Sequence, residues 1–435
     1  MSDALASPWI PTITLIGLAL VARQVNRSWL SPGPLAALIW AIYISACLLL
    51  TDYTIYASGI WVITLFVFSV IFGALLSEGF GRSPSGRPGS SISKPEILQI
   101  WGKRSLRFSL LFAVIAFIGC IRLLFVSFAK FSLDCSLIGL LSLGHQWSVE
   151  RYSGGLEPWS VRLLIMWVYP AVLLAGISFA LARNRVQKWL AIASLIPASL
   201  VGTVFAARAG LLISLICWFS GYFAIRHHQT GGTYTLFRKK FLLLVSAIMV
   251  GAVSFFMAID TVRIFKGGNL EVGTDLPRLS KYFLGSVPAF CDWVHGPKSQ
   301  EITMGAYTFA GVFDLLGIKQ RQVGLYERYE TLAGGEDTNI YTLFRGLIQD
   351  FTLPGAMVFC IFLGIAAGYA ASWEEKNQVG SVLILAGYYA FIIFSPLSSL
   401  FTYNGLILAW LVTALVLGTR RREAVVHARL LPSAI

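Results

Sequence analysis

The chain alternates long apolar segments with short polar ones over almost its whole length. A bilayer core of about 30 Å is crossed by about 20 helical residues. The pattern therefore predicts an all-α polytopic integral membrane protein, a single membrane domain over residues 1–435 with about eleven spans. The predicted spans are residues 8–22, 34–50, 59–77, 108–128, 161–182, 189–206, 209–225, 241–259, 354–372, 378–394 and 404–418.

The composition excludes a soluble globule. Hydrophobic residues make up 56% of the chain and charged residues only 13%, and the mean hydropathy is +0.72, whereas about a quarter of an average soluble domain is charged. The net charge of +13 raises the question of a nucleic-acid partner. In a membrane protein, however, basic residues usually mark the cytoplasmic ends of helices, so no nucleic-acid partner is expected.

Charge placement predicts the orientation. With the N-terminus outside, the cytoplasmic segments include a loop at 78–107, whose Gly/Ser/Pro-rich part reads as a flexible linker, and a tail at 419–435. All the cytoplasmic segments together hold 20 of the 34 basic residues and five acidic residues, as the positive-inside rule demands. The first apolar run lacks a preceding basic region, so we expect it to be retained as a span.

Two segments are predicted outside, at 129–160 and 260–353. The second has a near-balanced polar composition, with nine basic and eleven acidic residues. It also contains apolar pieces at 282–293 and 307–318 that are too short to span, a pattern typical of interfacial or re-entrant helices. We expect these pieces to cover a cavity that opens toward the outer leaflet.

Arginines gather at the outer side, against the positive-inside trend. An ionisable group at membrane depth normally faces protein or a water-filled cavity, and a guanidinium suits phosphate and diphosphate oxygens. The alternatives are snorkelling, for the arginine of the fourth span, and pairing with Glu150, Asp260 or Asp350. The candidate ligand-binding arginines are Arg122, Arg151, Arg208, Arg263, Arg278 and Arg345.

The six cysteines are scattered and show no metal-binding spacing, so neither a disulfide framework nor a metal or redox cofactor is expected. Cys135 and Cys291 are both predicted outside, and a bond between them stays open.

Several motifs in residues 145–372 resemble the bacterial oligosaccharide repeat-unit polymerases, the Wzy type that builds O-antigen and other surface polysaccharides. They are FAARAGLLISL, TVRIFKGG, KYFLGSVPAF, YTFAGVFDLLGI and EDTNIYTLFRGLIQDFTLPG. The most specific positions are Asn339, Tyr341, Thr342, Asp350, Phe351 and Gly355.

The resemblance implies a metal-independent glycosyltransferase of lipopolysaccharide biosynthesis, with a fold like that of GT-C-like lipid-linked glycosyltransferases. Such an enzyme joins undecaprenyl-diphosphate-linked oligosaccharides at the periplasmic face of the bacterial inner membrane. It also implies partners: the lipid-linked substrate, the bilayer, a chain-length regulator and other polysaccharide-assembly proteins.

This chemistry needs a group that stabilises the departing diphosphate and a base for the acceptor hydroxyl. The arginines, together with Tyr341, are the expected substrate-binding residues. The candidate bases are Asp350, Asp292 and His145. Two alternatives stay open: Asp350 is a helix N-terminal charge or the partner of Arg345, and His145 is only solvated.

Two rival functions remain. An O-antigen ligase or another polyprenyl-linked glycosyltransferase shares the chemistry. A lipid-linked glycan flippase or transporter would also use a basic cavity, but transporters usually show internal repeats and short external loops. This chain shows no repeat and has one large external loop.

Overall fold

The computed structural model describes residues 7–81, 95–152, 157–205, 208–230, 276–296, 302–319, 326, 329–332, 336–372 and 378–418, together with 243, 246, 250, 251 and 253–258. The described chain is almost entirely helical. Its helices are α1 (Trp9–Asn26), α2 (Pro32–Leu50), α3 (Ala57–Gly81), α4 (Pro95–Phe131), α5 (Leu137–Tyr152), α6 (Trp159–Ile165), α7 (Val168–Leu181), α8 (Arg185–Ala193), α9 (Ile196–Val204), α10 (Arg208–Thr230), α12 (Leu276–Leu284), α13 (Ser286–His295), α14 (Ala310–Leu315), α15 (Leu343–Ser372), α16 (Gln378–Phe394) and α17 (Asn404–Gly418), with a 3-10 turn η2 (Leu400–Thr402).

Seven stretches within the described residues are long and apolar enough to cross a membrane. Three of them are α2, most of α3 and α15, and a fourth is the apolar part of α4 from residue 98 onward. The others are α6 with α7, α8 with α9, and most of α10, whereas α16 and α17 are shorter apolar helices. The chain is therefore a polytopic helical membrane protein, as predicted. The count of eleven spans stays a prediction, and span 241–259 lies largely outside the described residues.

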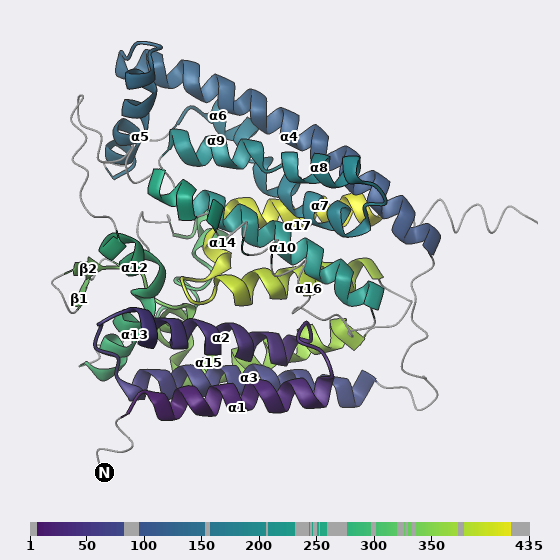
Figure 1. Ribbon diagram of the computed structural model, residues 1–435, viewed down its shortest axis with the longest axis vertical. Helices are drawn as coiled ribbons and strands as arrows, with labels where there is room; N and C mark the ends of the chain where they lie inside the picture. Colours follow the sequence, from purple (N-terminus) through teal and green to yellow (C-terminus); the bar gives the residue numbers. More distant parts are fainter. Residues whose placement is uncertain are drawn as a thin grey trace, which may run out of the picture.

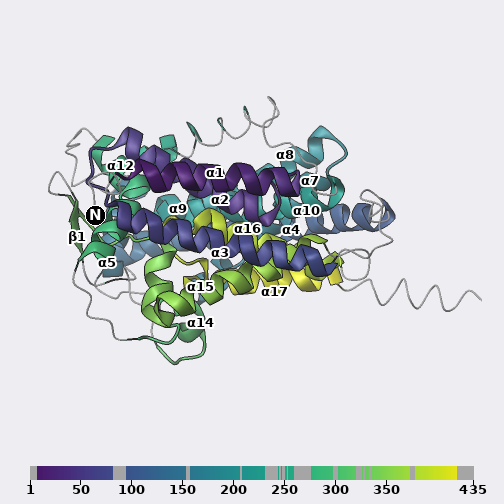
Figure 2. The ribbon, with the colours of Figure 1, turned by 90° about the horizontal axis from the view of Figure 1, so that it is seen from below.

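The long helices run in a common direction and form layers (Figures 1 and 2). In Figure 1, α1, α2, α3 and α15 lie on one side, α4, α6, α8 and α9 lie on the other, and α7, α10, α16 and α17 lie between them. At one end of the bundle lie α5, α12, α13 and a short hairpin of β1 (Glu330–Leu332) and β2 (Glu336–Thr338). We call this end, where α1 also begins, the hairpin end. Both segments predicted outside thus contribute to the same end.

Outward faces of the bundle are apolar, as expected of surfaces that contact lipid tails. Large hydrophobic side chains that are 65–72% exposed occur on several helices: Leu49, Leu50, Phe125, Trp189, Phe362 and Leu415.

Helices α3 and α15 pack closely along their length, and glycines allow it. A Cβ at Gly368 would lie 2.7 Å from the carbonyl oxygen of Ala74, and a Cβ at Gly364 would collide with the carbonyl oxygen of Val70. On the facing helix, a Cβ at Gly73 would collide with the backbone of α15. Small residues spaced four apart let membrane helices approach closely. Helix α3 and the second half of α15 therefore form a rigid pair next to the first half of α15.

Some boundaries differ from the predictions. The 37 residues of α4 extend about 55 Å and begin within the predicted cytoplasmic loop, because charged and polar residues continue the helix beyond the bilayer core. The loop predicted at 129–160 contains α5. The helix predicted from residue 354 corresponds to the part of α15 after a break at Thr352, and a further helical segment from Leu343, buried in protein rather than lipid, precedes that break.

Candidate functional site

The first half of α15 carries the candidate site. The amide of Leu343 donates a hydrogen bond to the carbonyl oxygen of Ser395 at 2.9 Å, and the ring of Phe344 stacks on Phe66 with centroids 4.6 Å apart. The helix therefore begins inside the bundle rather than in a surface loop. The next residue, Arg345, is only 4% exposed.

Three aromatic rings surround the Arg345 guanidinium. Its Cζ atom lies 3.7 Å from the ring centroid of Tyr341, 4.2 Å from that of Tyr326 and 5.4 Å from that of Trp293. Tyr341 precedes α15, Tyr326 comes from the large external loop, and Trp293 comes from α13. Aromatic faces attract cations, and more strongly when water is excluded. We call these four side chains the arginine cage.

The cage leaves Arg345 with unused donors. Its Nε and Nη1 atoms are buried and find no hydrogen-bond partner among the described residues. Nor does any Asp or Glu in the described part of the chain form an ion pair with it. A buried charge lacking such partners is costly. Because a guanidinium fork matches phosphate oxygens, the cage has the chemistry of an anion-binding site.

Asp350 does not supply the missing partner. Five residues along a helix correspond to a rotation of about 140°, so Asp350 and Arg345 leave α15 on different sides. Oδ1 of Asp350 accepts hydrogen bonds from the hydroxyl of Thr303 at 2.6 Å and the amide of Tyr307 at 3.1 Å. Oδ2 accepts one from the amide of Thr308 at 2.6 Å. The suggested ion pair with Arg345 is therefore wrong, and the carboxylate, which is 0% exposed, holds a loop instead.

That loop reaches the cage. The ring of Tyr307 stacks on Tyr326 with centroids 5.0 Å apart and an interplanar angle of 17°. A Cβ at Gly346 would lie 3.1 Å from the hydroxyl of Tyr326, so a glycine at this point of α15 lets the tyrosine approach. Lys319 brings a second positive charge, since its Nζ lies 5.6 Å from the ring centroid of Tyr307. Burial raises the pKa of Tyr326, so its phenol stays protonated.

A break in α15 lies about two helical turns beyond Arg345. Thr352 adopts φ 63° and ψ 172° inside the helix, and Pro354 has no amide to donate to the carbonyl of Asp350, so the helix kinks there. Beside the break lies an open groove of about 440 Å³. Its apolar lining residues are Ile302, Met304, Phe351, Val358, Phe359 and Phe362. The groove is suited to an aliphatic chain.

Asp292, unlike the buried Asp350, is a candidate base with a partly exposed side chain. It is partly buried on α13, one residue before the cage residue Trp293. Burial, and to a lesser extent the nearby Glu330 carboxylate of β1, raise its pKa to about 6, while His295 opposes the rise. A carboxyl with this pKa is close to the value that suits a base near neutral pH.

Two other predicted residues lie apart from the cage. Arg122 is exposed on α4, which fits the snorkelling alternative. His145 is partly buried on α5, which packs on α4 and α9. In Figure 1, α5 and α13 lie at opposite edges of the hairpin end. The structure brings together Arg345 and Tyr341 from the predicted set, with Asp292 and Asp350 nearby.

The remaining arginines lie where their side chains are not described. Arg151, Arg208 and Arg278 belong to α5, α10 and α12, but their side-chain surroundings are outside the described part of the structure, and Arg263 lies outside the described residues altogether. Convergence of these arginines with Arg345 stays a prediction.

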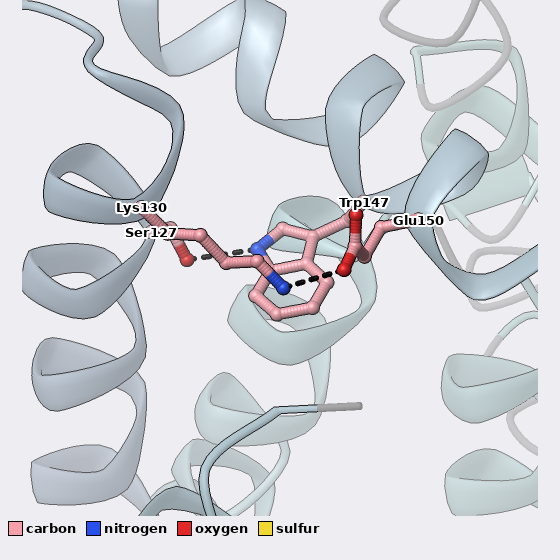
Figure 3. Close-up of polar contacts among 4 residues, drawn as sticks. All are labelled: Ser127, Lys130, Trp147 and Glu150. Atoms are coloured by element: carbon pink, nitrogen blue, oxygen red, sulfur yellow. Dashed lines mark hydrogen bonds and ion pairs between the residues drawn. The ribbon is translucent and has the colours of Figure 1, made fainter. Parts of the chain in front are cut away.

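A second cation–aromatic cluster lies at the junction of α4 and α5 (Figure 3). Lys130 forms an ion pair of 2.6 Å with Glu150, and its Nζ lies 5.0 Å from the ring centroid of Trp147. The indole of Trp147 donates a hydrogen bond to the hydroxyl of Ser127 at 2.8 Å. Glu150, predicted as a possible partner for an arginine, thus pairs with a lysine.

A bond between Cys135 and Cys291 is ruled out. Both are free thiols, the first exposed and the second buried. The reason is packing: the Sγ of Cys291 faces the start of α3, where a Cβ at Gly59 would lie 2.5 Å away.

Sequence reasoning missed three residues around the cage: Trp293, Tyr307 and Lys319. Trp and Tyr near membrane boundaries are usually belt residues, so composition alone gave no signal for the first two. The available signal was position, since each lies on an apolar piece of the external loop too short to span, or just after one.

No protein-family model, curated protein or solved structure matches this chain. The fold and the site define a polytopic helical membrane protein with a buried, aromatic-walled arginine at its hairpin end. Its function has to be argued from that site.

Proposed function

We propose that the protein is a polymerase that joins undecaprenyl-diphosphate-linked oligosaccharide repeat units into O-antigen or a related surface polysaccharide. It works at the periplasmic face of the bacterial inner membrane, with the hairpin end outside. The observation that carries the proposal is Arg345, a buried guanidinium whose Nε and Nη1 meet no acceptor among the described residues.

The proposed reaction is a glycosyl transfer. The hydroxyl oxygen of the acceptor sugar bonds to the anomeric carbon of the donor glycan, and the bond from that carbon to the diphosphate oxygen breaks. The electron pair leaves with undecaprenyl diphosphate, and the hydroxyl proton passes to a base. Negative charge grows on the leaving oxygen, so a preorganised guanidinium in a water-poor setting lowers the barrier.

The surroundings of Arg345 suit the two ends of such a carrier. The apolar groove beside the α15 break accommodates isoprenoid chain at the level of the bilayer, and the cage accommodates the diphosphate. Lys319, beside Tyr307, adds positive charge for a ligand with more than one negative charge.

Asp292 is the proposed proton acceptor. Both carboxylate oxygens of Asp350 are engaged by the 303–308 loop, whereas Asp292 is only partly buried and has a raised pKa. It follows that Asp292 is ionised at neutral pH yet basic enough to accept a proton in the transition state.

The test is polymerisation by the purified full chain, reconstituted with lipid-linked repeat units and without ATP or an ion gradient. A ladder of lengthened lipid-linked glycans is expected from the wild type and from Arg122→Ala, a control that removes an exposed arginine of α4. Arg345→Ala should yield single units only. Arg345→Lys should recover little, because a point charge cannot make the bidentate contact.

Other outcomes favour the rivals. Transfer to a lipid A core acceptor without lengthening indicates a ligase. Movement of lipid-linked units across the bilayer with no new glycosidic bond indicates a flippase. Normal ladders from Arg345→Ala would refute the role assigned to the cage.

A further inference from the structure

The segment at 302–309 lies between the groove and the arginine cage. Ile302 and Met304 line the groove, and Tyr307 stacks on the cage residue Tyr326. Its backbone turns sharply, with φ of 50° at Met304 and 95° at Gly305. A segment with positive φ at two successive residues needs outside contacts to hold one conformation.

Those contacts come chiefly from the end of the first half of α15. The amide of Thr303 donates to the carbonyl oxygen of Gln349 at 3.1 Å. The Asp350 carboxylate accepts from the hydroxyl of Thr303 and from the amides of Tyr307 and Thr308, at 2.6, 3.1 and 2.6 Å. Hydrogen bonds to an ionised, buried acceptor are among the strong ones, so one carboxylate fixes three points of the segment.

We propose that Asp350 is a positioning residue which, by holding the 302–309 segment, presses Tyr307 against Tyr326 and so sets the Arg345 guanidinium for an anionic diphosphate. This inference rests on the proposed function, because it concerns how the same cage binds its ligand. Asp350 acts on the cage through Tyr307. It also lines the groove, where both of its carboxylate oxygens accept hydrogen bonds from the 303–308 segment.

The geometry shows how Asp350 can affect Arg345. Arg345 and Asp350 point to different sides of α15, and the segment connects the two sides through the stack of Tyr307 on Tyr326. The ring of Tyr326 contacts both residues: its centroid lies 4.2 Å from Cζ of Arg345 and 5.0 Å from the ring centroid of Tyr307. Releasing the 302–309 segment therefore removes the support that Tyr307 gives to Tyr326. The helix between Arg345 and Asp350 is unchanged.

An electrostatic effect of Asp350 and a positioning effect predict opposite changes in diphosphate binding, so one variant can distinguish them. Asp350→Asn removes a negative charge from the neighbourhood of Arg345, so electrostatics alone predicts tighter binding of an anion. Positioning predicts weaker binding, because the amide that replaces one oxygen presents donors to the donating backbone amides of the segment. A base role, in contrast, predicts unchanged binding with a fall in turnover.

The experiment measures binding of farnesyl diphosphate, a short isoprenoid diphosphate, to the full chain by calorimetry in detergent. Arg345→Ala should abolish measurable binding. Asp350→Asn and Tyr307→Ala should each weaken it about tenfold, as expected for the loss of hydrogen bonds to a charged group. The double variant should be little weaker than either single one, because both changes break one link. Asp134→Asn, which removes a carboxylate from the α4–α5 connection, should bind like the wild type.

A milder variant guards against misfolding of Asp350→Asn. Thr303→Val keeps shape and leaves the carboxylate in place while removing one of its three donors, and it should weaken binding about threefold.

The outcomes separate the two proposals. If Arg345→Ala binds farnesyl diphosphate normally, the diphosphate site of the proposed function is wrong. If Arg345→Ala fails to bind but Asp350→Asn, or Thr303→Val together with Tyr307→Ala, binds as well as the wild type, the cage survives and the positioning role is overturned. Additive losses in the double variant would also overturn it.

Discussion

Two cations at the hairpin end of this protein meet aromatic rings, and they differ in what else they meet. Lys130 lies over Trp147 and is paired with Glu150, with 34% of its side chain exposed. Arg345 lies among three rings, is 4% exposed, and forms no ion pair with any described residue. The first is a completed structural contact. The second leaves two guanidinium donors without a hydrogen-bond partner among the described residues, which makes Arg345 the candidate for ligand binding and Lys130 a structural contact.

The comparison predicts the largest effect at Arg345. Arg345→Ala should reduce polymer formation by a factor of about 100 or more, the scale of losing a preorganised charge at the leaving group. Its thermal unfolding midpoint should fall little, because the loss of contacts with three rings is offset by removal of a buried charge that forms no ion pair with any described residue. Activity on lipid-linked units and a thermal melt of the same preparation check this. A clear drop in the midpoint would make Arg345 a structural residue like Lys130.

The second-largest effect on activity is expected at Asp292, together with a characteristic dependence on pH. Asp292→Asn should lower turnover by about 100-fold. The wild type should gain activity as pH rises through about 6, with half of the full activity near that pH and a plateau above it, since the base must be ionised. The raised pKa also means that the folded state binds more protons than the unfolded state between the ordinary value of 3.8 and about 6. Stability should therefore fall with rising pH over that window.

The Asn variant of Asp292 should lack both slopes. Activity and melting profiles between pH 4 and 8 for the two proteins provide the measurement. A wild-type activity profile that is flat through pH 6 would exclude this carboxyl as the base.

A smaller effect is expected at the walls of the cage. Tyr341→Leu removes the nearest ring, at 3.7 Å, but keeps the apolar volume, and should weaken farnesyl diphosphate binding about threefold to tenfold, the scale of one cation–π contact. Tyr341→Phe keeps the ring and should bind like the wild type. Equal losses in the two variants would assign the effect to the hydroxyl instead.

The smallest effect is expected at Lys130. Lys130→Met keeps the stem that packs on Trp147 but removes the ion pair, and partly exposed pairs contribute about 1 kcal/mol or less. Polymerisation should be unchanged and the melting midpoint only slightly lower. Loss of polymer in this variant, with the protein intact, would remove the contrast between the two clusters.

The sequence predicted the helical membrane architecture because long apolar runs have few other stable forms. It also singled out Arg345, as one of the arginines that gather at the outer side, and Tyr341, which lies in the short stretch that resembles a polymerase. The sequence could not predict the role of Trp293. This residue lies 52 positions before Arg345 and contacts the guanidinium only because α13 packs against α3. The different orientation of Asp350 was in principle available from helical geometry, whereas its three donors depend on turns at Met304 and Gly305.

The close packing of α3 on α15 determines which substitutions the protein tolerates along these helices. Gly73, Gly364 and Gly368 face the backbone of the opposing helix, and each leaves no room there for a single methyl group. A scan of all substitutions should therefore score these glycines as severely as Arg345. Intolerance along this helix pair reports steric closeness, and only residues that lose activity while the protein keeps its melting midpoint report chemistry.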